Sequence, residues 1–105
     1  MTKKEVEDRV AASASRLVLV DFHAAWCGTC KVMMPGIDKL DEEMGDQLHV
    51  IKINVDGDGN RDLAKAYGIS SIPALFLYQD GRLVENNTFT GTIKNLNELV
   101  GKYVE

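Results

Sequence analysis

Two cysteines separated by two residues, Cys27 and Cys30, are the side chains of this sequence best suited to carry out chemistry. Two thiols at this spacing can ligate a metal, or they can exchange electrons with a disulfide by passing between the dithiol and disulfide states. A disulfide between them would close too small a loop to stabilise a fold much. We therefore interpret the pair as redox-active or metal-binding.

The position of the pair in the predicted elements distinguishes its two members. Residues 17–22 form an apolar run typical of a buried strand. Behind the cysteines, apolar residues recur at the spacing of a long helix: Met33, Ile37, Leu40 and Met44. Because the first turn of a helix favours a thiolate over a thiol, Cys27 is the candidate nucleophile. Cys30, one turn further along, is the candidate resolving thiol that attacks a mixed disulfide on Cys27.

An acid and a base inside apolar segments are further candidates. Asp21 interrupts the first apolar run, and an isolated buried carboxylate is costly unless it is neutral, paired or functional. Lys52 interrupts a second run, residues 48–55, and is the candidate partner of Asp21. We expect Asp21 to accept the proton that Cys30 loses before it attacks. The alternative is that Asp21 caps a turn and that Lys52 extends its ammonium group into solvent.

The N-terminal half is predicted to contain a helix, a strand, the long helix and a second strand. Thr2 and Glu5 form a capping box ahead of apolar residues at helical spacing, Val6, Val10 and Ala14. The order of strand, helix and strand implies that the strands at 17–22 and 48–55 are parallel, with a right-handed crossover between them.

The C-terminal half is predicted to contain a short helix, a hairpin and a closing helix. Asn60 is expected to cap the short helix, and Gly68 suits its end. Asp80-Gly81 is a strong type I′ turn signal between strands at 74–78 and 82–90. The closing helix is indicated by apolar residues at helical spacing: Ile93, Leu96, Val100 and Tyr103. We predict an α/β fold with a central mixed four-stranded sheet flanked by helices, as one domain over residues 1–105.

The sequence around these candidates resembles the thioredoxin family. The similarity covers roughly residues 17–104 and is carried by Val20-Asp21-Phe22, Trp26-Cys27-Gly28-Thr29-Cys30-Lys31, Lys52, Tyr67-Gly68-Ile69 and Ile72-Pro73. It implies a thioredoxin-like fold and the reduction of disulfides in other proteins through Cys27 and Cys30. It also implies that no cofactor is bound and that an NADPH-dependent thioredoxin reductase restores the dithiol.

The resemblance also implies a substrate groove beside the cysteines. Pro73 would follow a cis peptide bond, and the Ile72 backbone would pair with an extended segment of the substrate. Trp26, Ile72, Pro73 and Gly91 would line the groove.

Two residues near the cysteines depart from the family pattern. Thr29 stands where the family usually has proline, and a hydroxyl there could donate to the Cys27 thiolate. One such charge-assisted bond is worth about 1.5 to 3 kcal/mol, which would raise the redox potential by about 30 to 60 mV. His23 stands where the family usually has tryptophan. A protonated His23 would favour the thiolate near pH 6 to 7, whereas the alternative is an exposed loop histidine without a role.

Two further departures concern the sheet. The chain begins with its first helix, whereas the family usually has a strand before it, so the strand that carries Lys52 is expected at a sheet edge. The spacing between Gly81 and Gly91 is about two residues longer than is usual in the family. We therefore predict a bulge or turn at Asn86-Asn87.

Composition narrows the partners and the location. The net charge is −4, and twelve basic residues are scattered among sixteen acidic ones, which argues against a nucleic-acid partner. The N-terminus carries acids where a signal peptide needs an apolar stretch, and no apolar run approaches membrane-spanning length. We expect a cytoplasmic monomer that acts on disulfide-containing proteins and does not bind a membrane.

Other motifs in the sequence are compatible with functions other than disulfide reduction. A closed zinc site needs four ligands, and the chain has two cysteines and two histidines, so we expect no metal. Residues 56–60 mimic the start of an EF-hand loop, but Arg61 and Tyr67 stand where that loop needs glycine and glutamate, which predicts a solvated turn. Two other functions remain as alternatives: a more oxidising disulfide carrier or isomerase, and a binding or chaperone module with incidental thiols.

Overall fold

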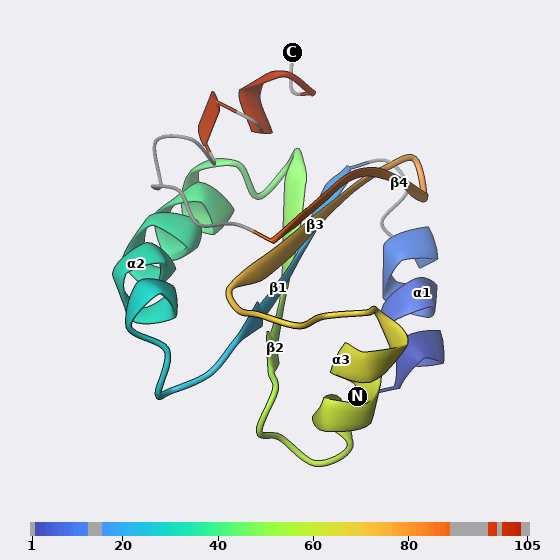
Figure 1. Cartoon of the computed structure of the whole chain (residues 1–105). Helices are drawn as coiled ribbons and strands as arrows, with labels where there is room; N and C mark the ends of the chain where they lie inside the picture. Colours follow the sequence, from blue (N-terminus) through green and yellow to red (C-terminus); the bar gives the residue numbers. More distant parts are fainter. Residues whose placement is uncertain (1, 13–15, 89–96, 99, 104–105) are drawn as a thin grey trace.

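The computed structural model describes residues 2–12, 16–88, 97–98 and 100–103. Its helices and strands follow in the order α1 (Lys3–Ala12), β1 (Leu17–His23), α2 (Gly28–Glu43), β2 (Leu48–Asn54), α3 (Asn60–Ala66), β3 (Ala74–Gln79) and β4 (Arg82–Thr88). Residues 97–98 and 100–101 are helical as well. The sheet lies between α2 on one face and α1 with α3 on the other (Figure 1).

The described strands form one mixed sheet in the order β2-β1-β3-β4. Strands β1 and β2 are parallel, and β3 is antiparallel to both β1 and β4. This arrangement confirms the predicted α/β fold with a four-stranded mixed sheet. Strand β2, which carries Lys52, lies at the edge of the described sheet, as expected.

Alternation along β1 divides its side chains between two cores. The core beneath α2 contains Leu17, Leu19, Met33, Ile37, Leu40, Leu48, Leu75, Leu77 and Val100. The core beneath α1 and α3 contains Val6, Val10, Val18, Val20, Phe22, Ile51, Ile53, Leu63, Ala74 and Phe76. Strand β1 is therefore covered on both faces, and from its end the chain enters the cysteine segment.

Helix α1 begins as predicted. The backbone N–H of Glu5 donates to Thr2 Oγ1 at 3.2 Å, and the backbone N–H of Thr2 donates to Glu5 Oε1 at 3.3 Å. The capping box is therefore confirmed, and its helix buries Val6 and Val10 against the sheet. Ala14 lies outside the described residues.

The start of α3 differs from the prediction. Asn60 is the first residue of the helix rather than its cap, and Gly59 occupies the cap position with a left-handed φ of 75°. The Asn60 side chain instead donates to the Asn54 carbonyl oxygen at 2.7 Å. Because glycine has no side chain, the start of α3 has no side-chain cap hydrogen bond. The predicted end is confirmed, because Gly68 follows the helix with a φ of 69°.

The hairpin between β3 and β4 turns at the two predicted residues. Asp80 and Gly81 have φ values of 53° and 79°. A type I′ turn requires a positive φ at both central positions. The predicted turn is therefore confirmed.

The irregularity in this hairpin lies elsewhere than expected. The register shifts between Leu77 and Tyr78, which leaves Val84 of β4 as the extra residue. Asn86 and Asn87 are in regular register with β3, so the prediction of a bulge at these two residues is wrong. Val84 packs against the core beneath α2, which gives the extra residue a buried contact that asparagine would not gain.

Two described residues near the C-terminus, Val100 and Tyr103, pack on the same core. Val100 is buried, and Tyr103 lies against the core and donates its hydroxyl hydrogen to Glu85 Oε1 at 2.8 Å. Of the four residues that predicted the closing helix, Ile93 and Leu96 lie outside the described residues. Within the described part of the chain, no helix combines the length and apolar character needed to cross a bilayer.

Candidate active site

The cysteine pair lies where β1 passes into α2. Cys27 occupies the N-cap position of α2, and it is joined by a disulfide bond to Cys30 in the first turn, with 5.2 Å between the Cα atoms. The backbone N–H of Cys30 donates to Cys27 Sγ at 3.1 Å. This donor and the helix dipole stabilise negative charge on the Cys27 sulfur once the disulfide is reduced.

Small and apolar side chains surround the disulfide. Cys27 and Cys30 are buried together with Ala24, and Val55 and Ile72 pack against them. The Ile72-Pro73 peptide bond is cis, as the resemblance implied, and Pro73 is buried directly before β3. The expected proximity of this turn to the cysteines is therefore observed through Ile72.

The Thr29 side chain is exposed beside the pair. Among the hydrogen bonds of the described residues, Cys27 Sγ accepts from the Cys30 backbone and not from the Thr29 hydroxyl. This geometry is that of the disulfide, whereas the expected bond from Thr29 goes to the thiolate of the dithiol form. A role for Thr29 in the redox potential stays a prediction.

Asp21 is buried in β1 and has no hydrogen-bond partner among the described residues. Its side chain is 1% exposed, and neither carboxyl oxygen is bonded. The pKa of Asp21 is raised to about 6, mainly by burial; the Lys52 charge lowers it and the Asp38 charge contributes to raising it. The carboxyl is therefore mostly ionised at pH 7, and it can take up a proton at little cost.

Lys52 is not the direct partner of Asp21 that was expected. It is the register partner of Asp21 across β1 and β2, but its ammonium group forms an ion pair with Asp38 of α2. Both side chains of that pair are partly exposed, so the ammonium stays hydrated there. Lys52 thus acts on Asp21 through space only.

His23 ends β1 and is half-buried. Burial, and then the nearby Lys52 charge, lower the pKa of His23 below 6.5. A lowered pKa makes the protonated imidazole scarcer at pH 7, which counts against the hypothesis that a protonated His23 favours the thiolate. A role for His23 stays a prediction.

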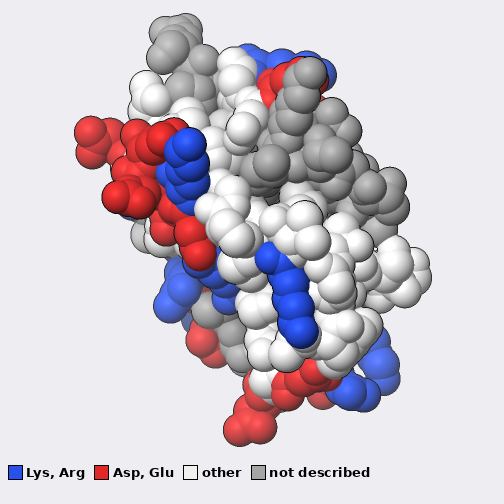
Figure 2. Space-filling model, turned by 90° about the vertical axis from the view of Figure 1, so that its left-hand side faces the viewer, with Lys and Arg blue, Asp and Glu red and all other residues white. Residues whose placement is uncertain are grey.

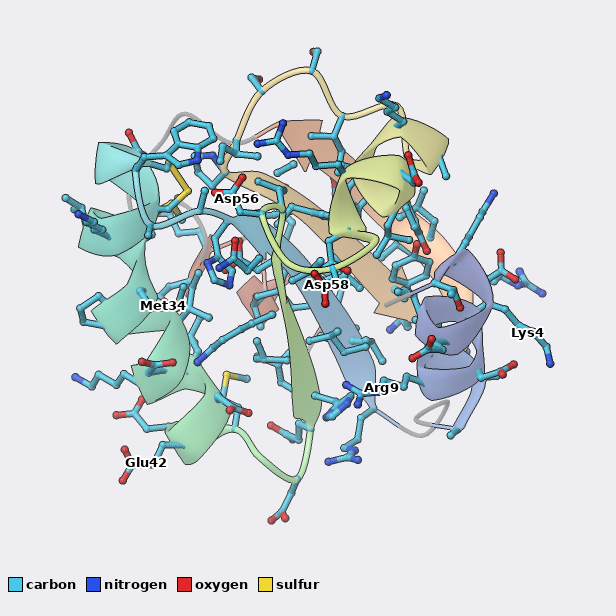
Figure 3. The ribbon with its side chains drawn as sticks, turned by 90° about the horizontal axis from the view of Figure 1, so that it is seen from below. Lys4, Arg9, Met34, Glu42, Asp56 and Asp58 are labelled. Carbon is cyan, nitrogen blue, oxygen red and sulfur yellow. A yellow bond between two sulfur atoms is a disulfide. The ribbon has the colours of Figure 1, made fainter. Side chains whose placement is uncertain are left out.

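Trp26 is held over the site by a residue that the sequence analysis missed. Its indole Nε1 donates to Asp56 Oδ2 at 2.8 Å, although its side chain is largely exposed. Arg61 donates to the other oxygen of Asp56 at 3.1 Å, and the Asp56 backbone N–H donates to Asn54 Oδ1 at 2.9 Å. Figure 3 shows Asp56 beside the end of α2 that carries the disulfide.

A signal for Asp56 was present in the sequence. Asp56 follows β2 closely, as the cysteine segment follows β1. The carboxyl ends of two parallel neighbouring strands meet at one edge of a sheet, which brings the residues behind them together. The resemblance of residues 56–60 to a calcium loop drew the prediction to a solvated turn instead.

A groove of about 390 Å³ opens beside the disulfide and is lined by Trp26, Val55, Ala64, Ile69, Ser70, Ser71 and Ile72. Trp26 and Ile72 were expected there, whereas Pro73, which was also expected, is not among the residues that line it. Gly91 was also expected to line it, but this residue lies outside the described part of the chain. On the side that α2 covers, acidic side chains gather at the left of the view and again at its lower end, and the area between them is mainly uncharged, with one basic side chain across it (Figure 2). Among the described residues, no three His, Cys, Asp or Glu side chains are grouped so that they could hold a metal ion.

Comparison with known proteins gives a consistent result. The family model for thioredoxin matches residues 1–103. The thioredoxin of Bacillus subtilis is 43% identical over 94 residues, which are 90% of this chain and 88% of the relative. The thioredoxin of Listeria monocytogenes is 35% identical over 103 residues, which are 96% of this chain and 98% of the relative.

Solved structures agree with these relatives. A mutant thioredoxin from Halobacterium salinarum superposes with a TM-score of 0.81 at 35% identity, covering 100% of this chain and 88% of that one. A second chain matches with a TM-score of 0.79 at 25% identity, covering 94% of this chain and 88% of that one. It comes from a structure of the thiol resolving mechanism in yeast mitochondrial 1-Cys peroxiredoxin via glutathione/thioredoxin systems.

Proposed function

Because the chain belongs to the thioredoxin family and is a dithiol-disulfide oxidoreductase that reduces protein disulfides, we propose that Cys27 is its attacking thiolate and Cys30 its resolving thiol. The observation that carries this assignment is the bond from the Cys30 backbone N–H to Cys27 Sγ at the start of α2. It gives Cys27 Sγ a donor that favours negative charge, and no described residue donates a hydrogen bond to Cys30 Sγ.

The reaction then runs in two exchanges. The Cys27 thiolate attacks one sulfur of a substrate disulfide, whose S–S bond breaks as a mixed disulfide with Cys27 forms. The departing substrate sulfur leaves as a thiolate and takes up a proton from water. Cys30 next attacks Cys27 Sγ, which forms the Cys27-Cys30 disulfide and releases the second substrate sulfur. Two electrons pass from the protein dithiol to the substrate.

Asp21 is proposed as the acceptor of the Cys30 proton in the second exchange. The Cys30 thiol, buried in the first turn of α2 among small and apolar side chains, loses its proton reluctantly, because burial disfavours the thiolate. A carboxyl with a pKa of about 6 is ionised at pH 7 and is a stronger base than an ordinary aspartate. It can later return the proton to Cys30 when the disulfide is reduced again.

The groove beside Trp26 and Ile72 is proposed to hold the substrate. Its walls are mainly apolar, and it opens next to the disulfide. An extended segment that carries the substrate disulfide would lie there, with the Ile72 backbone pairing to it. Pro73 and Gly91 take the family roles given above, and Gly28 is proposed as a supporting residue between the two cysteines.

We also propose that an NADPH-dependent thioredoxin reductase restores the dithiol, and that no bound cofactor takes part. Membership of the family supports this electron source. We further propose that residues 1–105 form one domain that acts as a cytoplasmic monomer. The match of the family model to residues 1–103 supports the single domain.

Coupled NADPH oxidation tests the proposal. The reduced protein is regenerated by a thioredoxin reductase while a protein disulfide such as that of insulin is the final acceptor. We expect sustained NADPH oxidation that requires this chain and that the double substitution Cys27→Ser and Cys30→Ser abolishes. Oxidation that persists at the same rate in the double variant would overturn it. A redox potential close to that of an oxidase or isomerase would favour the more oxidising carrier instead.

A further inference from the structure

Three charged side chains lie on the same side of the sheet, beneath or beside α2. Asp21 faces this side because every second residue of a strand points the same way, and Leu17 and Leu19 of β1 belong to the core under α2. Lys52 of β2 is the register partner of Asp21. Asp38 of α2 forms the ion pair with Lys52.

Two carboxyl groups, those of Asp21 and Asp38, thus lie near the ammonium group of Lys52, which binds only one of them. It binds Asp38, whose side chain is 53% exposed, and among the residues that the structure describes, both oxygens of the buried Asp21 stay without a hydrogen-bond partner. A pairing with Asp38 keeps the ammonium at the surface, where water still solvates it. A pairing with Asp21 would require much of that hydration to be lost.

We propose that Asp38 is a positioning residue that sets the proton affinity of Asp21 by holding the Lys52 ammonium group away from it. Without Asp38, the ammonium has Asp21 as its acidic neighbour on the adjacent strand and turns toward it. A closer positive charge favours the ionised carboxyl. The inference rests on the proposed role of Asp21 as acceptor of the Cys30 proton.

Among the charged and titratable groups around Asp21, the Lys52–Asp38 ion pair is the influence on its pKa that a substitution can change. His23, on the same strand, is neutral at pH 7 because its pKa is lowered. Strand β3 places the apolar Leu75 opposite Asp21. Helix α2 contributes Cys30 near its start and Asp38 further along. The Asp21 pKa is influenced by Lys52 and Asp38 in opposite directions, in agreement with the geometry.

The consequence for the reaction concerns pH. An Asp21 of lower proton affinity is a weaker base toward the Cys30 thiol, although it is ionised over a wider pH range. The pH at which the second exchange becomes fast would therefore follow the Asp21 midpoint. Asp38, an exposed residue further along α2, would thus tune a step that occurs at Cys30 in the first turn of the same helix.

The test measures the Asp21 midpoint directly. Aspartate labelled with carbon-13 at the side-chain carboxyl reports ionisation by NMR as the pH of the oxidised protein is varied. In the variant Asp38→Asn we expect the Asp21 midpoint to fall by about half a unit to one unit. The Asp21 midpoint should fall at least as far in Asp38→Ala, which also removes the acceptor oxygen. In Asp38→Glu it should stay near the parent value.

Two controls separate the proposed route from plain loss of a negative charge. Asp41→Asn removes an equal charge from the exposed side of the same helix, one turn further along, and should leave the midpoint nearly unchanged. The substitution Asp38→Asn is also made in a Lys52→Met background, where no ammonium can move. The shift should largely disappear there. A shift of equal size in that background, an equal shift from Asp41→Asn, or no shift in Asp38→Asn and Asp38→Ala would overturn the proposal.

The rate of the second exchange distinguishes this inference from the proposed function. The release of a labelled substrate peptide from a mixed disulfide on Cys27 is followed against pH in the parent and in Asp38→Asn. A pH profile that moves with the Asp21 midpoint supports both. A midpoint that moves while the profile stays fixed supports the positioning by Asp38 and overturns the role of Asp21 as proton acceptor.

Discussion

The indole nitrogen of Trp26 donates a 2.8 Å hydrogen bond to Asp56, a residue thirty positions further along the chain. The bond joins the turn before the cysteines to the loop behind β2. Asp56 is itself fixed by Arg61 of α3, so the orientation of an exposed aromatic ring depends on three segments. Because Trp26 lines the groove, this contact shapes the surface that a substrate would meet.

Removing the Asp56 carboxylate should free the ring. In Asp56→Ala we expect the KM for a protein disulfide to rise roughly fivefold, with a smaller change in kcat, since a hydrogen bond worth about 1 kcal/mol is lost. Steady-state reduction of insulin measures both constants. Trp26 is the only tryptophan of the sequence, so its fluorescence anisotropy reports the released ring directly.

The control for this change is Asp58→Ala, which removes an exposed carboxylate from the same loop. It should leave both the anisotropy and the KM close to the parent values. If Asp56→Ala and Asp58→Ala changed the anisotropy and the KM alike, a general effect of loop charge, and not the bond to Trp26, would explain the result.

The buried Asp21 should cost stability at neutral pH. Burial raises its pKa from 3.8 to about 6, so the folded state holds the proton more tightly than the unfolded state does. Below pH 3.8 both states are protonated and the carboxyl imposes no ionisation cost. Between these values stability falls as the pH rises, and above pH 6 the cost is constant, at about 3 kcal/mol for a shift of about two units.

Substituting Asp21→Asn removes this dependence. The stability of the variant relative to the parent should rise by about 3 kcal/mol from acid to about pH 8, because asparagine cannot ionise. Urea unfolding of the oxidised proteins at several pH values measures the difference. A relative stability that does not change with pH would show that the Asp21 carboxyl has an ordinary pKa.

Thr29 should make the protein a weaker reductant. If its hydroxyl donates to the Cys27 thiolate, Thr29→Pro removes a bond that exists in the dithiol form only, and the redox potential should fall by about 30 to 60 mV. Equilibration with glutathione buffers of known potential measures it. Thr29→Ser, which keeps the hydroxyl, should stay near the parent. A proline variant equal to the parent or more oxidising would contradict the prediction.

The elements and the redox site followed from local patterns. The capping box of Thr2 and Glu5 and the turn at Asp80-Gly81 depend on residues a few positions apart, and both were predicted correctly. The cis bond before Pro73 had no local signal and came from the resemblance alone.

What the sequence left undetermined depends on contacts between distant segments. Lys52 has two acids near it in space, and its choice of Asp38 reflects the better solvation at the surface, which periodicity cannot show. Asp56 was predicted to be a solvated turn residue, because its partner Trp26 lies thirty positions away. The bulge at Val84 was missed for a similar reason, since packing on the core beneath α2 decides it.

The most direct test of the account separates the two sulfur atoms. Each cysteine is replaced by serine in turn, and each variant is mixed at neutral pH with a protein substrate that carries a disulfide. Cys30→Ser should accumulate a mixed disulfide between Cys27 and the substrate, detected by mass spectrometry, because no resolving thiol can release it. Cys27→Ser should accumulate almost none. If instead Cys27→Ser trapped the substrate as efficiently as Cys30→Ser, Cys27 would not be the attacking thiolate and the proposed mechanism would be wrong.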